Sequence, residues 1–198
     1  MLKQISLLIL CAVAIVLFAT PVHACTSAVV SGKVTLDGRP LLWKNRDTDF
    51  MRNHVDYVKG ERYDFIAVVN SANAYLKEAW MGTNSAGFAL MNTQSYNLVD
   101  VKGDEERGAA NGRVIYRALE VCATVEDFCH FLDTISKPSD IEANFGVIDA
   151  QGGAAMFEVD YYKYVMYDAN NPKDAPYGYI ARTNFSFAGK VNEGAGYV

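Results

Sequence analysis

The strongest constraint on the fold is the order of patterns along the chain: strand-like segments, a pair of helices, then strand-like segments again. Residues 26–94 and 143–184 hold short apolar-rich runs separated by Gly-containing turns. Residues 112–122 and 125–135 instead place apolar side chains at helical spacing. One helical pair between two blocks of strands favours an α+β fold, with antiparallel sheets and helices packed on their outer faces, over a βαβ fold.

The individual elements are predicted from local signals. Residues 26–47 read as two strands joined at Asp37-Gly38, a dipeptide typical of hairpin turns. Thr124 and Asp127 form the pattern of a capping box, with Asp in place of the usual Glu, at the start of the second helix. Further strands are predicted at 64–69, 74–80, 88–94, 143–150, 154–160, 162–168 and 177–184, turns at 82–87 and 151–153, and an exposed loop at 100–111.

The first 24 residues differ from the rest. Lys3 is their only charge, residues 5–19 are nearly all apolar, and a small-residue exit ends at Ala24. This is typical of a secretory signal peptide, and the run is short of the roughly 20 residues that a membrane-spanning helix needs. We therefore predict a signal peptide at 1–24 and one domain at 25–198, exported to the periplasm or secreted. The closing residues show no final element, so the domain is expected to be cut short at its C-terminus.

Composition and charge exclude several classes of function. The chain is 51% hydrophobic, which indicates a folded core, and its net charge of -5 argues against a nucleic-acid binder. Gly152-Gly153 is read as a hairpin turn and not as a phosphate loop, because no helix follows it. His54 and His130 have no neighbours at a recognised ligand spacing apart from the cysteine beside His130. Neither a metal nor another cofactor is expected.

The cysteines raise the question of what Cys25 does. Cys11 would leave with the signal peptide, and a disulfide between Cys122 and Cys129 is plausible in an oxidising compartment. That pairing leaves Cys25 as an odd cysteine at the predicted cleavage point. A cysteine that becomes residue one carries its α-amino group beside its thiol. With a pKa of roughly 7.7–8.0, that amine can act as the general base for the thiol.

Three asparagines are candidates for stabilising the negative charge of a tetrahedral intermediate. Asn45, Asn92 and Asn184 each stand near the end of a predicted strand, and an Asn amide is a suitable oxyanion donor. An Asn in that position is more often a turn residue. The set therefore points to catalysis only if Cys25 is terminal.

The order of several short segments around these residues resembles that of a known family. "CTSAVV" at the cleavage site, then "KNRD", "NSAGFALMN", "NFGVIDAQGGAAMFEVD" and "ARTNF" are similar in order to segments of the N-terminal-nucleophile hydrolases. Within them the chain resembles the choloylglycine hydrolase, penicillin V acylase and acyl-CoA:penicillin acyltransferase group. The resemblance implies an αββα sandwich that cleaves linear, non-peptide C–N amides through a thioester acyl-enzyme. It also leaves open an acyltransferase that uses the same acyl-enzyme.

The resemblance also implies roles for particular residues. Cys25 would be the nucleophile and, through its amine, the base. Asp47 would hold that amine, Asn184 would orient it, and Asn92 would be the oxyanion donor. Where the family reads Arg-Asn-x-Asp, this chain has Lys44 at the arginine position.

The cation beside the thiol is not decided by the sequence, since either Lys44 or Arg46, two residues further on, could supply it. A further catalytic Arg that the family places beyond the Asn184 region has no counterpart here. The substrate-binding residues are not predicted.

Two other interpretations of Cys25 remain open from the sequence. A lipoprotein signal also ends before a Cys, although His23 fits such a signal poorly; lipidation would make the protein a membrane-anchored, non-catalytic binding module. Cys25 could also be a buried structural side chain. The predicted partner is a small-molecule amide, with no membrane if Cys25 is free, and a homo-oligomer is left open. Trp43 and Trp80 are expected in the core.

Overall fold

The computed structural model describes residues 24–72, 74–99 and 108–190. The predicted signal peptide up to residue 23, most of the predicted loop at 100–111 and the last eight residues lie outside this part of the chain. The described elements are β1 (Thr26–Val30), η1 (Gly32–Val34), β2 (Leu41–Asn45), β3 (Asn53–Val58), β4 (Phe65–Asn70), η2 (Ala74–Leu76), β5 (Met81–Asn84), β6 (Ala89–Gln94), α2 (Asn111–Val121), α3 (Val125–Thr134), β7 (Ala143–Ile148), β8 (Ala154–Val159), β9 (Tyr164–Asp168) and β10 (Tyr179–Arg182).

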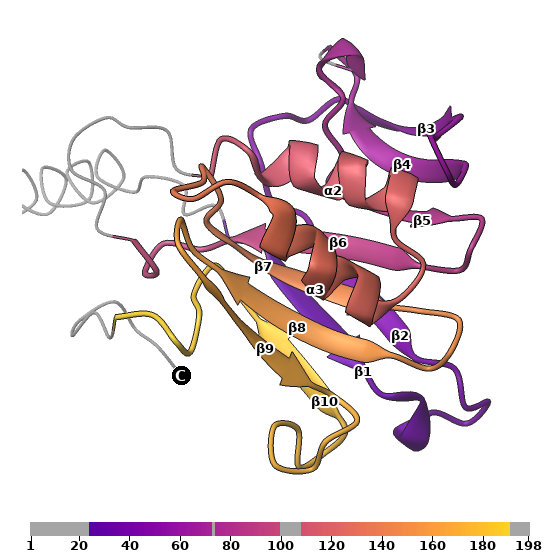
Figure 1. Ribbon diagram of the computed structural model, residues 1–198, viewed down its shortest axis with the longest axis vertical. Coiled ribbons are helices and arrows are strands. Elements are labelled where there is room, and N and C mark those ends of the chain that lie inside the picture. Colours follow the sequence, from indigo (N-terminus) through magenta and orange to yellow (C-terminus); the bar gives the residue numbers. More distant parts are fainter. Residues whose placement is uncertain (1–23, 73, 100–107, 191–198) are drawn as a thin grey trace, which may run out of the picture.

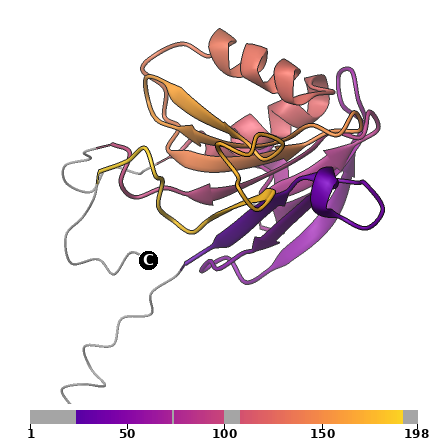
Figure 2. The same ribbon diagram turned by 90° about the horizontal axis from the view of Figure 1, so that it is seen from below.

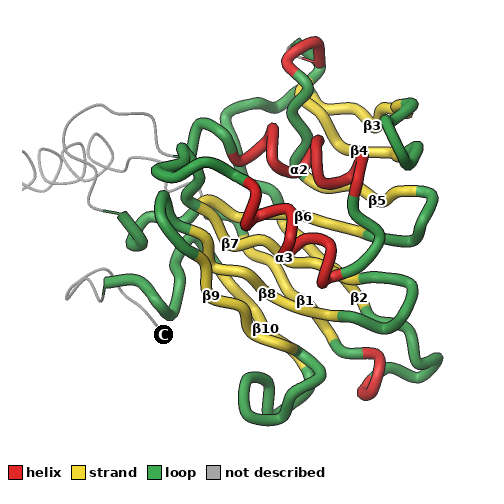
Figure 3. Tube along the Cα trace, viewed as in Figure 1, coloured by secondary structure: helices red, strands yellow, loops and turns green. Residues whose placement is uncertain are grey.

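The strands form two antiparallel sheets. The larger sheet has seven strands in the order β3-β4-β5-β6-β7-β8-β9, and the smaller has three in the order β10-β1-β2. Helices α2 and α3 cover one face of the larger sheet, and the smaller sheet lies against its other face (Figures 1 and 2). The colouring by secondary structure shows the same helix and sheet layers (Figure 3). The predicted α+β class with antiparallel sheets is confirmed, and both described α-helices lie on the same face of the larger sheet.

Two apolar cores hold these layers together. Between the helices and the larger sheet, Phe128 of α3 packs edge-to-face on Phe157 of β8, with ring centroids 5.1 Å apart. Between the two sheets, Val29 of β1 and Ile180 of β10 pack against Met91 and Met156. Strand β8 is therefore buried along its whole length, which explains its nearly continuous apolar sequence.

Both α-helices form where the sequence predicts them. Helix α3 starts with the predicted capping box: the Thr124 side chain accepts from the Asp127 backbone N–H, and the Asp127 carboxylate accepts from the Thr124 N–H. Helix α2 buries the apolar face that its sequence spacing predicted, including Ile115 and Leu119. Neither helix in the described part of the chain is long and apolar enough to cross a membrane.

Several predicted elements were wrong. β1 and β2 pair antiparallel as predicted, but β1 ends at Val30, and a connection with a 3₁₀ turn at Gly32–Val34 replaces the predicted tight hairpin at Asp37-Gly38. Residues 74–80 form a 3₁₀ turn and a loop, not a strand. Strand β3 lies at the edge of the larger sheet and is half polar, and the sequence pattern did not predict it. Trp43, expected in the core, is 53% exposed on the outer face of the smaller sheet.

The suggested disulfide is not formed. Cys122 and Cys129 are both free thiols. Cys122 is buried in the helix–sheet core, where burial raises the pKa of its thiol to about 12. The Cys129 sulfur instead lies 3.9 Å from the sulfur of Met166. Both side chains are therefore structural, as weakly reactive thiols in apolar surroundings usually are.

Candidate active site

Strand pairing brings the predicted site residues to one end of the two sheets. In the smaller sheet Thr26 pairs with Asn45 and Ser27 with Arg182, so the start of β1 lies beside the ends of β2 and β10. Cys25 therefore lies between the segments that carry Asp47 and Asn184. The cavity there has a volume of about 270 Å³, and its lining residues are Cys25, Lys44, Arg46, Asp47, Thr48, Asp49, Phe50, Trp80, Asn92, Gln94, Tyr96 and Asn184. All six predicted catalytic residues share this cavity.

Asp47 and Asn184 hold the backbone on either side of the Ala24–Cys25 bond. The Cys25 N–H donates to Asn184 Oδ1 at 2.7 Å, and the Ala24 N–H donates to Asp47 Oδ2 at 2.9 Å. Asn184 is itself fixed, since its Nδ2 donates to the backbone carbonyl of Gln94 at 2.8 Å. The Cys25 sulfur lies 3.5 Å from the Asp47 carbonyl oxygen. The nitrogen and the sulfur of Cys25 are thus both positioned within the cavity.

Lys44 reaches the cavity from β2 and is largely buried. Its Nζ donates to the backbone carbonyl of Trp80 at 3.0 Å and to Asn92 Oδ1 at 3.1 Å. Burial lowers the pKa of its ammonium group to about 7, with a further lowering by Arg46 and an opposing, raising effect of Cys25. Lys44 and Asn92 are therefore directly coupled.

Arg46 occupies the rim of the same cavity. Its guanidinium donates to the side-chain oxygens of Asn53 and Asn70, the latter at 2.8 Å, and lies 5.1 Å from the centre of the Trp80 ring. Burial lowers the pKa of this group, and Cys25 opposes that shift. Both cations that the sequence left as alternatives thus lie at the cavity, in different roles. Lys44 contacts an oxyanion candidate, whereas Arg46 contacts an aromatic ring and the amides of Asn53 and Asn70.

Other residues of the cavity carried no sequence signal. Trp80 was expected in the core, yet it lines the site, and its Nε1 is a buried polar atom without a hydrogen-bond partner in the described part of the chain. Phe50, Gln94 and Tyr96 join the lining from loops and strand ends far apart in sequence. Conversely, Asn45, the third oxyanion candidate, is exposed on β2 and does not line the cavity.

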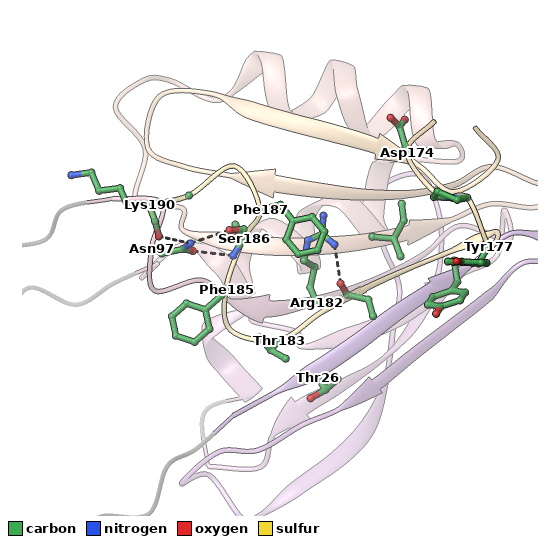
Figure 4. A pocket seen from close by; sticks show the side chains of 15 residues that line it. Thr26, Asn97, Asp174, Tyr177, Arg182, Thr183, Phe185, Ser186, Phe187 and Lys190 are labelled. Atoms are coloured by element: carbon green, nitrogen blue, oxygen red, sulfur yellow. Dashed lines mark hydrogen bonds between the residues drawn. The ribbon is translucent and has the colours of Figure 1, made fainter. Parts of the chain in front are cut away.

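A larger cavity of about 740 Å³ lies beside β10 and the segment that follows it (Figure 4). Thr26 and Thr183, the neighbours of Cys25 and Asn184, line it, but Cys25 does not. Its wall is held by polar contacts: Asn97 binds the backbone of Ser186 and Lys190, as Figure 4 shows. This wall connects directly to the backbone that positions Asn184.

The described residues hold no group of three or more His, Cys, Asp or Glu side chains that could bind a metal ion. The groups that line the cavity include a thiol, two cations, two carboxylates and several amides. That set can activate a sulfur nucleophile and stabilise an oxyanion.

Comparison with solved structures finds proteins that are similar in fold to this chain. The conjugated bile acid hydrolase from Clostridium perfringens, as a mutant, matches with a TM-score of 0.52 at 15% identity over 73% of this chain and 50% of its own. A Caenorhabditis elegans orthologue of N-acylethanolamine-hydrolyzing acid amidase matches with a TM-score of 0.59 at 15% identity, over 82% of this chain and 70% of its own. The chain thus spans about half the length of the bile acid hydrolase.

Two further comparisons concern the sequence. A search among curated proteins finds no match. The model of the acyl-coenzyme A:6-aminopenicillanic acid acyl-transferase family matches residues 35–196, most of the chain. Because this match covers more than half of the chain, the chain belongs to the acyl-coenzyme A:6-aminopenicillanic acid acyl-transferase family.

Proposed function

We propose that this chain is an exported amidohydrolase of linear, non-peptide C–N bonds, with Cys25 as its nucleophile once residues 1–24 have been removed. One observation carries the proposal. The nitrogen of Cys25 is bound by Asn184 at 2.7 Å while its sulfur lies in the cavity that Lys44, Asp47 and Asn92 also line. Removal of residues 1–24 turns that nitrogen into an α-amine held by the same oxygen.

The reaction follows from these positions. The free amine takes the thiol proton, and the thiolate of Cys25 attacks the amide carbonyl, forming a C–S bond. The negative charge on the former carbonyl oxygen is stabilised by the Asn92 amide. The C–N bond then breaks, and the leaving amine takes the proton that the Cys25 amine had accepted. Water attacks the resulting thioester by the same route, releasing the carboxylic acid and the thiol.

A second outcome uses the same acyl-enzyme. The match to an acyl-transferase family favours transfer of the acyl group from Cys25 to an acceptor amine in place of water. The two reactions share every residue of the first half-reaction. They differ only in which nucleophile enters the cavity after the first product leaves.

The first test is the intact mass of the protein purified from a host that exports it. We expect a chain that begins at unmodified Cys25 and gains one acyl group when mixed with an N-acyl amide. The panel comprises conjugated bile acids, N-acylethanolamines, penicillin V and N-acyl amino acids. A chain that carries a diacylglyceryl group and a further acyl group is a lipoprotein. A chain that retains residues 1–24 has no free amine on Cys25. Either result contradicts the proposal.

Replacing Asn92 with alanine tests the oxyanion role. We expect kcat to fall by roughly 10²–10³-fold with little change in KM, because the lost donor acts mainly on the transition state. Asn45→Ala is the matched control, since Asn45 lies on β2 outside the cavity. Steady-state kinetics on the best substrate of the panel decides the question. A rise in KM at unchanged kcat contradicts the assigned role.

A further inference from the structure

We propose that Lys44 is a positioning residue, which holds the Asn92 amide oxygen so that the amide NH₂ group faces the reacting carbonyl at Cys25. The inference rests on the proposed function and adds a dependence on pH to it.

The first argument is the hydrogen-bonding capacity of an ammonium group. Lys44 Nζ donates to two oxygens, the Trp80 carbonyl at 3.0 Å and Asn92 Oδ1 at 3.1 Å. A protonated lysine has three donors and no acceptor, so it can bind the oxygen of an Asn amide but not its nitrogen. Protonated Lys44 therefore excludes the flipped amide of Asn92. A flip would bring donor against donor.

The second argument is the placement of Asn92. Its side chain is buried, at 4% exposed, in β6 of the larger sheet, and it lines the cavity that contains Cys25. Because Lys44 occupies the oxygen side of the amide, the nitrogen side is the one left for the cavity. An oxyanion forming on a carbonyl bound to Cys25 needs a donor there, not an acceptor.

The third argument concerns charge. The titratable and charged groups that line the cavity with Lys44 are Cys25 before β1, Arg46, Asp47 and Asp49 after β2, and Tyr96 after β6. The segments of Trp80, Asn92, Gln94 and Asn184 add only neutral side chains. Burial brings the pKa of Lys44 to about 7, so Lys44 loses its proton within the working range of most enzymes.

The consequence is an alkaline limit on activity. Neutral Lys44 can both donate and accept, so it no longer discriminates between the two amide orientations of Asn92. We expect the alkaline limb of the kcat profile to come from Lys44, which loses its proton at a pH of about 7. The terminal amine, with an ordinary pKa of roughly 7.7–8.0, acts in the opposite direction, because it must be deprotonated to serve as base.

The kinetic test compares Lys44→Arg with Lys44→Met. Arginine stays protonated throughout, so we expect Lys44→Arg to retain activity at pH 6 and to lose the fall in kcat above pH 7. Lys44→Met should lower kcat about 10-fold or more at unchanged KM, part of the roughly 10²–10³-fold effect of an oxyanion donor. Lys33→Met is the control: Lys33 Nζ also binds a carbonyl oxygen, at 2.8 Å, but it is exposed and outside the cavity.

A second readout does not depend on turnover. In ¹⁵N-labelled mature protein, the side-chain NH₂ signals of Asn92 can be assigned by their absence from Asn92→Ala. We expect these signals to titrate with a midpoint of about 7 in the wild type and to lose that midpoint in Lys44→Arg.

The two readouts separate the possible failures. Asn92 signals that titrate in a protein without any acyl-enzyme would contradict the proposed function alone. Asn92 signals that do not respond to Lys44 overturn the positioning role. A decline in kcat that persists above pH 7 in Lys44→Arg also overturns it.

Discussion

Substituting Cys25 by alanine is expected to abolish turnover and acyl-enzyme formation without changing the fold. In this variant the terminal amine, Asp47 and Asn184 remain, but no sulfur is left to attack the carbonyl. Loss of a nucleophile in comparable enzymes lowers kcat by about 10⁶-fold, and we expect a loss of at least about 10⁴-fold here. The side chain is only half-buried, with one sulfur contact at 3.5 Å to the Asp47 carbonyl, so the thermal unfolding midpoint should barely move.

The matched control is Cys129→Ala. Cys129 is the other half-buried free thiol of the described chain, and it lies against Met166, away from the cavity. Its removal should leave kcat within about 2-fold of the wild type, since surface changes away from special features have small effects. The measurement is amide hydrolysis together with intact mass after incubation with substrate. A Cys25→Ala variant that hydrolyses the amide at the normal rate would contradict the proposed mechanism.

The second large effect is expected from the buried ion pair between the sheets. Glu158 of β8 and Arg182 of β10 have side chains 0% and 2% exposed, and Arg182 Nε donates to Glu158 Oε1 at 2.5 Å. Glu158 also accepts the backbone N–H groups of Phe187 and Ala188. The Arg182 guanidinium lies 3.7 Å from the centre of the Phe187 ring (Figure 4). The pair therefore anchors the segment after β10.

Breaking the pair leaves one charge buried without its partner. We expect Glu158→Gln and Arg182→Met each to lower the free energy of unfolding by about 3–5 kcal/mol, measured by urea denaturation. Changing both residues to Met should cost less than the two single losses added together, because no charge is then left unpaired. Activity should fall with stability, since Asn184 lies two residues beyond Arg182.

An exposed ion pair provides the control for this experiment. Asp37 and Arg39 have side chains 51% and 82% exposed. Asp37→Asn should change the free energy of unfolding by less than about 1 kcal/mol, as exposed pairs do. If Glu158→Gln were no more destabilising than Asp37→Asn, the buried pair would not be the anchor that its contacts indicate.

The candidate site could be predicted from the sequence only in part. Cys25 was found from its place at a predicted cleavage point, and Asp47, Asn92 and Asn184 from short segments resembling those of a known family. The structure brings these four to one cavity and leaves Asn45 outside it. Trp80 was missed because an aromatic side chain after an irregular segment has no periodicity to reveal which surface it covers. Lys44 and Arg46 could not be assigned, since Lys44 lies in β2 and Arg46 directly follows its last residue.

Elements with local causes were determined by the sequence alone. Helix α3 starts where the capping box of Thr124 and Asp127 lies, because its contacts span only three residues. The β7–β8 hairpin turns at Gly152, whose positive φ of 91° suits a glycine. The tertiary structure alone decided where Trp80, Lys44 and Arg46 point, that Cys122 and Cys129 stay unpaired, and which asparagine reaches Cys25. Those outcomes depend on contacts between strands far apart in sequence, which no local pattern encodes.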